Sequence, residues 1–95
     1  MVKDYWRSLE KRYAEVIGRV VRVHRELQGT SLTDMARIMG VTPSAWSRVE
    51  TGVTTMSVGQ LKRAAYQLGV APHVLAKEAD DLLASVSPKR KRDNA

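Results

Sequence analysis

The 95-residue sequence contains no cysteine and no long apolar run. Without cysteine the chain has no disulfide framework and no thiolate ligand for a metal, which fits a reducing compartment. No apolar stretch approaches the roughly 20 residues that a membrane-spanning helix requires, and the first residues lack the apolar centre of a secretory signal. We therefore expect a soluble cytoplasmic protein that has no membrane partner.

Acidic residues are scarce relative to basic ones. The chain has 16 lysines and arginines against 10 aspartates and glutamates, a net charge of +6. This sign is expected for a protein with a polyanionic partner. The excess is concentrated at the ends, because residues 1–28 carry seven bases and four acids and residues 87–95 carry four bases and one acid. The charge favours a nucleic acid but does not locate the contact.

Patterns for catalysis and for metal binding are also missing. His24 and His73 have no cysteine or neighbouring acid pair, so they give no metal-ligand spacing. No serine has a histidine and a carboxylate in a recognised local arrangement, and no glycine-rich phosphate loop is present. We interpret the chain as a non-enzyme with no catalytic residue, metal, cofactor or small-molecule ligand. His24 is interpreted as a half-buried, hydrogen-bonded core residue, and His73 as a surface residue near a helix start.

Residues 31–52 have the pattern of two short helices joined by a tight turn. Ser31 can cap the first helix, with Asp34 at capping-box spacing, and Gly40 can end it in a left-handed conformation. Thr42 precedes Pro43, which suits a first helical position, so a second helix begins at once and crosses the first steeply. The side chains that face inward at helical spacing are Met35, Ala36, Met39, Trp46 and Val49.

A long helix precedes this pair. Asp4 can cap it, and it continues without proline to about Gln28. Its apolar residues follow heptad spacing in one continuous stripe of Trp6, Leu9, Tyr13, Val16, Val20, Val23 and Leu27. Two alternatives account for this stripe, because it can be covered by the C-terminal helix of the same chain or can form a dimer interface.

Two more helices follow the central pair. Ser57 can cap a helix that ends at Gly69 and whose inward positions are Val58, Leu61, Ala65 and Leu68. Pro72 opens a C-terminal helix with heptad positions at Leu75, Ala79, Leu82 and Val86. We expect one domain over residues 1–86. Residues 87–95 form a charge run that predicts a disordered basic tail, either a solvated segment or an arm that adds phosphate or minor-groove contacts.

The segment Ser31 to Gly52 resembles the helix-turn-helix of the lambda-repressor-like, Cro-type (XRE) DNA-binding family. The resemblance extends from about Ile17 to Leu75 and includes Ile17-Gly18, Val21-Arg22, Arg25, Gly29, Glu50-x-Gly52, Val58, Leu61, Ala65, Leu68, Gly69 and Val70. Each signal alone is common, but the ordered set is specific. It implies an all-α, five-helix domain with a family core at 17–75. The long first helix adds an N-terminal helical extension at residues 1–16, and the C-terminal helix covers 72–86.

The resemblance also implies roles for individual residues. The second short helix would lie in the major groove, with Arg48 long enough for a bidentate contact to guanine or, alternatively, placed over a phosphate. The implied base contacts are Pro43, Ser44, Ser47 and Arg48, and the implied phosphate contacts are Ser31, Thr42, Thr54 and Thr55. Arg25 and Glu50 match the positions of a structural ion pair in the family.

Two positions depart from the family pattern. Leu32 stands where the family commonly has a phosphate-contacting glutamine, and the segment after Gly52 lacks the usual bases. Phosphate affinity must then come from other residues, and the candidates are Arg22, Arg37, Lys62, Arg63 and the tail. Arg22 and Arg37 can equally be solvated or paired on the surface.

Three functions fit the sequence. The leading hypothesis is a sequence-specific regulator of double-stranded DNA, a repressor that binds a palindromic operator as a homodimer. The second is an antitoxin-like protein that binds its own promoter and a protein toxin, and the third is an interaction module without DNA binding. The predicted dimer interface comprises Trp6, Leu9, Tyr13, Val16, Val20, Val23, Leu82 and Val86.

Overall fold

The computed structural model describes residues 2–86. Five α-helices and no strand occur in that part of the chain, as the sequence predicts. The helices are α1 (Val2–Gln28), α2 (Leu32–Met39), α3 (Pro43–Glu50), α4 (Val58–Leu68) and α5 (Pro72–Val86). The predicted tail at 87–95 lies outside the described residues.

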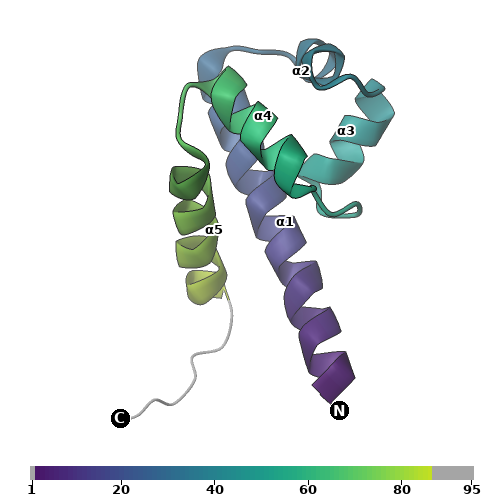
Figure 1. Ribbon diagram of the computed structural model, residues 1–95, viewed down its shortest axis with the longest axis vertical. Coiled ribbons are helices and arrows are strands. Elements are labelled where there is room, and N and C mark those ends of the chain that lie inside the picture. The colour runs from purple at the N-terminus through teal and green to yellow at the C-terminus, as the bar shows by residue number, and fades with distance from the viewer. Residues whose placement is uncertain (1, 87–95) are drawn as a thin grey trace.

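The long helix α1 is the axis of the molecule (Figure 1). α5 packs along one side of α1, α4 crosses it, and α2 and α3 pack against each other above the crossing. The molecule measures 45 × 24 × 19 Å, so α1, at about 1.5 Å per residue, spans most of its length. The N-terminal turns of α1 project beyond the other helices (Figure 1).

One core joins all five helices. Its largest fully buried side chains are Trp46, Met35, Leu75 and Val21. The predicted inward residues of α2 and α3, which are Met35, Ala36, Met39, Trp46 and Val49, are all buried in it. The periodicity of these two short helices therefore identified the face that each one buries.

Side-chain caps set the limits of α2 and α3. The Ser31 hydroxyl accepts a hydrogen bond from the Asp34 amide at 3.0 Å, and α2 ends at Gly40 with φ 74°. The Thr42 hydroxyl caps α3 in the same way, with Pro43 in the first turn. The chain therefore turns from one helix to the next over residues 40–42.

Two predictions need correction, one about a helix start and one about the burial of a side chain. α1 begins at Val2, so Asp4 lies within the first turn instead of capping it from outside. The Ser57 hydroxyl caps α4, as predicted, in a capping box with Gln60. Val58, however, was predicted to face inward and is 84% exposed. Val58 shares a helical face with Ala65, yet the space it faces is an open groove at the end of the core.

The stripe on α1 is divided by α5. Val16 and Val20 are buried in the core that Leu75 and Ala79 of α5 complete, so intrachain packing accounts for the middle of the stripe. Tyr13 and Leu82 are partly buried against the same core, whereas the side chain of Val86 lies outside the described set. The exposed members are Trp6, Val23 and Leu27, at 53%, 46% and 80%.

The two histidines occupy the predicted kinds of position. His24 is half-buried, and its Nε2 lies 2.8 Å from Oε1 of Glu78, which ties α1 to α5. His73 is exposed in the first turn of α5. Within residues 2–86 no group of His, Cys, Asp or Glu side chains is placed to hold a metal. None of the helices described is both long enough and apolar enough to cross a membrane.

Gly18 allows α1 to approach the end of α3. A Cβ at this position would lie 2.5 Å from the carbonyl oxygen of Val49 and 2.6 Å from that of Glu50. Both are backbone atoms, which cannot swing aside as a flexible side chain can. The close contact of α1 with α3 therefore depends on the missing side chain.

Gly18→Ala is expected to lower the free energy of unfolding by about 1–3 kcal/mol, because overpacking outweighs the better helix propensity of alanine. Urea denaturation midpoints measure this change. The control is Gly59→Ala in α4, where the nearest atom to the new Cβ is 3.9 Å away. This control should be neutral or slightly stabilising. Equal midpoints for wild type and Gly18→Ala would show that α1 and α3 can separate without cost.

Candidate nucleic-acid interface

The outward face of α3 is polar and carries one base. Pro43, Ser44 and Arg48 are exposed and Ser47 is half-exposed, while Trp46 and Val49 are buried on the opposite face. Arg48 Nη1 donates a hydrogen bond to the Ser44 hydroxyl at 3.2 Å, one turn earlier in the helix. The predicted base contacts are thus brought together on one helix.

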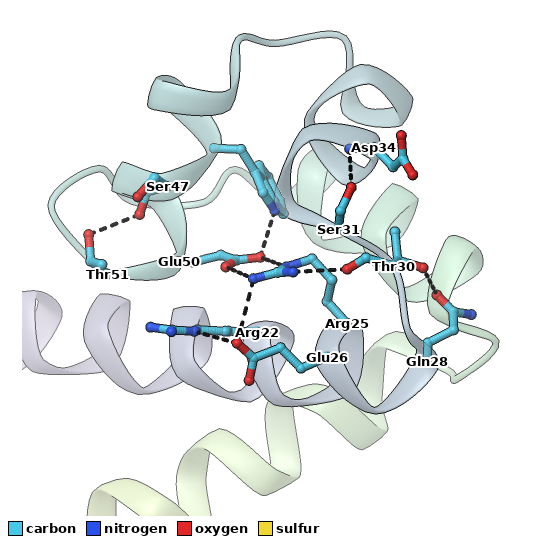
Figure 2. Close-up of polar contacts among 11 residues, drawn as sticks. Arg22, Arg25, Glu26, Gln28, Thr30, Ser31, Asp34, Ser47, Glu50 and Thr51 are labelled. Atoms are coloured by element: carbon cyan, nitrogen blue, oxygen red, sulfur yellow. Dashed lines mark hydrogen bonds and ion pairs between the residues drawn. The ribbon is translucent and has the colours of Figure 1, made fainter.

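A buried ion pair attaches α3 to α1 (Figure 2). Arg25 Nε donates to Glu50 Oε2 at 2.7 Å, and Arg25 Nη2 donates to Glu50 Oε1 at 3.0 Å. Both residues are buried, with 7% of Arg25 and 4% of Glu50 exposed. The two parallel bonds fix the orientation of the carboxylate as well as its distance.

Two further hydrogen bonds extend this pair. Trp46 Nε1 donates to Glu50 Oε2 at 2.8 Å. Arg25 Nη1 donates to the carbonyl oxygen of Thr30 at 2.9 Å (Figure 2). The hydrogen bonds to Glu50 raise the pKa of Arg25 above its ordinary value, against the opposing effect of burial. The guanidinium therefore stays charged, and it joins α1, α3 and the segment before α2.

The predicted phosphate contacts lie at helix starts and in the connector from α3 to α4. Ser31 and Thr42 are exposed at the N-termini of α2 and α3, and each accepts a hydrogen bond from its own helix. A hydroxyl that accepts such a bond keeps its own proton to donate to a phosphate. Thr54 and Thr55 are exposed in the connector, where the Thr54 amide donates to the carbonyl oxygen of Arg48 at 3.1 Å.

Two of the candidate phosphate-binding arginines are paired on the surface. Arg22 Nε lies 3.0 Å from Glu26 Oε2, and Arg37 pairs with Asp34. Lys62 and Arg63 are exposed on α4 and have no ion pair with any residue in the described range. Arg22 and Arg37 are therefore paired on the surface, which was one of the two predicted alternatives. Lys62 and Arg63 of α4 are the better candidates for phosphate contacts.

Sequence reasoning missed two bases on the N-terminal extension. Arg7 and Lys11 of α1 line a hollow together with Thr51 and Val53 of the connector, and the acids Glu10 and Glu15 line it as well. The spacing of four residues between Arg7 and Lys11 places these two bases on one side of α1. That signal was available, but only the fold places the connector beside them.

Comparison with known proteins agrees with this geometry. A family model described as a helix-turn-helix domain matches residues 16–77, and no curated protein matches the chain. Two crystal structures of the clp gene regulator ClgR from Corynebacterium glutamicum are similar, with TM-scores of 0.74 and 0.71 and identities of 26% and 25%. The alignments cover 77% and 81% of this chain and 78% and 96% of those chains. The chain therefore belongs to this family of helix-turn-helix domains, as the resemblance predicts.

Proposed function

We propose that the protein is a sequence-specific DNA-binding transcriptional regulator that represses from a palindromic operator as a homodimer. The observation that carries this proposal is the two-sided character of α3. One face presents Ser44 and Arg48 to solvent, and the other is fixed by the buried Arg25 and Glu50 pair. The similarity to a gene regulator supports the same class of function.

In this proposal α3 lies in the major groove of the operator. Its outward side chains contact base edges, and those residues are Pro43, Ser44, Ser47 and Arg48. Hydroxyls at the helix starts and in the connector contact phosphates on either side, and those residues are Ser31, Thr42, Thr54 and Thr55. The phosphate contacts set the register of α3, and the base contacts select the sequence.

An antitoxin-like role remains the second candidate. The observation in its favour is the exposed apolar surface on the extension of α1, where Tyr5 and Trp6 are 55% and 53% exposed. A protein partner can use such a surface while α3 binds DNA elsewhere on the molecule.

Selection of bound duplexes from a random pool tests the proposed function. We expect enrichment of an inverted repeat whose half-sites are centred about one helical turn apart, roughly 34 Å, or a multiple of it. The control is a pool carried through the same rounds without protein. Enrichment no greater than in that pool would contradict sequence-specific DNA binding. Enrichment of an unrepeated motif would contradict the symmetric dimer but not the contact with DNA.

A further inference from the structure

An apolar groove of about 530 Å³ lies between the N-terminal half of α1, the start of α4 and the end of α5. Its apolar walls include Trp6, Leu9, Met56, Val58, Leu61 and Leu83. Trp6 is 53% exposed and Val58 is 84% exposed, although both face this space. Contiguous apolar surface of this kind marks an interaction site in a water-soluble domain.

The two charged residues that line the groove are acids, and two bases lie on the adjoining side of α1. Glu10 and Asp80 line the groove, and neither makes a hydrogen bond or ion pair with another residue of the described chain. Arg7 and Lys11 lie on the adjoining side of α1, and within residues 2–86 the ion pair of Arg7 is a distant contact of 3.9 Å with the exposed Asp4. One molecule therefore presents an apolar groove lined by two acids and, beside Trp6 on α1, two bases that share their hollow with Glu10 and Glu15.

We propose that the groove is occupied by the N-terminal half of α1 from a second copy of this chain. The contact is isologous, so that Trp6 of each copy packs into the groove of the other and the bases Arg7 and Lys11 face the other copy's carboxylates Glu10 and Asp80. A two-fold contact requires a self-complementary surface. Each copy supplies both the groove with its acids and the helix with Trp6 and its bases, so the surface is self-complementary. The inference deepens the proposed function by naming the surface that forms the dimer.

This surface differs from the interface that the heptad stripe predicts. Val16 and Val20 are excluded because the core of their own chain buries them. Residues of α4 and of the connector are included instead, Val58 and Met56 among them. The exposure of Val58 then has a reason, because the second copy covers it.

The groove is continuous with the segment that follows the recognition helix. Thr55 and Met56 form part of its wall, and the neighbouring Thr54 amide is bonded to Arg48 at the end of α3. A second copy in the groove therefore contacts the connector that carries two predicted phosphate contacts. Variants of the groove should weaken binding to a duplex with two half-sites and leave binding to one half-site nearly unchanged.

Sedimentation of the full chain without DNA tests the interface. We expect a wild-type dimer at micromolar concentration and a dissociation constant raised at least about tenfold by the double variant Trp6→Ala with Val58→Asp, because a central aromatic anchor is lost. Both side chains are exposed, so helicity by circular dichroism should not change. The control is Tyr66→Ala, which removes an 87% exposed aromatic on α4 outside the groove. A monomeric wild type, or a double variant that dimerises like wild type, overturns the proposal.

A charge exchange distinguishes a second copy from any other occupant. One variant carries Glu10→Lys and Asp80→Lys, and the other carries Arg7→Glu and Lys11→Glu. Each should be monomeric alone because its groove and helix then have the same charge, and an equimolar mixture should form heterodimers. A mixture that stays monomeric overturns the pairing.

The two proposals fail in different ways. A monomeric wild type that still enriches a DNA sequence overturns the interface and leaves DNA binding in place. If the groove variant dissociates the dimer but the wild type enriches no sequence, the interface is supported and sequence-specific DNA binding is contradicted.

Discussion

Glu50→Ala is expected to lower the free energy of unfolding by about 3 kcal/mol, because it leaves the buried charge of Arg25 without its partner. The Glu50 side chain is 3% exposed and accepts hydrogen bonds from Arg25 and from Trp46. Its removal therefore orphans donors on two helices, and the vacated space is closed to bulk water. DNA affinity should fall as well, since the same contacts fix α3 to α1.

Urea denaturation followed by circular dichroism measures this effect. The matched control is Asp81→Ala, which removes an acid whose partner Lys77 is 75% exposed, so the midpoint should move little. A second variant, Glu50→Gln, retains hydrogen-bonding atoms but not the charge and should fall between wild type and Glu50→Ala. If Glu50→Ala unfolds at the wild-type midpoint, the pair does not stabilise the fold.

The limits of the short helices were predictable because their causes are local. Ser31, Thr42 and Ser57 each bond to an amide three residues later, so the cap and its partner are read from the same short stretch. The contact of Trp46 with Glu50 also spans one helical turn. The resemblance pairs Glu50 with Arg25, but the hydrogen bond from Trp46 to Glu50 was not predicted, because only the fold shows both side chains at the same buried junction.

The division of the apolar stripe was not predictable from α1 alone. Val20 and Trp6 occupy equivalent heptad positions in the sequence, yet Val20 is buried in the core and Trp6 is 53% exposed. The difference depends on where α5 lies against α1, which is a contact between segments more than forty residues apart in the sequence. The burial of Val58 was predicted wrongly for the same reason. The helical spacing shows which side of α4 the side chain is on, but only the fold shows that this side faces an open groove.

Arg48→Ala is expected to weaken binding to the preferred site by about 1–3 kcal/mol and to relax the preference at one base pair in each half-site. Arg48 is exposed on α3, and its bond to the Ser44 hydroxyl holds the side chain along the outward face. Random duplexes should bind the variant nearly as well as they bind wild type. This pattern follows if the guanidinium contacts a guanine edge.

A phosphate contact would give a different pattern. Loss of a backbone contact should weaken preferred and random duplexes to the same extent and lower the salt dependence. The matched control is Arg63→Ala, because Arg63 is an exposed arginine on α4, outside the recognition helix. If Arg48→Ala lowers the affinity for preferred and random duplexes equally, Arg48 contacts a phosphate. Base recognition would then depend on the serines of α3 or on residues outside this helix.

The central claim is that α3 reads a DNA sequence. The most direct measurement is the ratio of wild-type affinities for the selected duplex and for a scrambled duplex of the same length and composition, at one salt concentration. Specific DNA-binding proteins prefer their sites by at least about 1,000-fold, and we predict a ratio of that order for this protein. A ratio near one would contradict the claim, because the protein would then bind DNA through its charge alone.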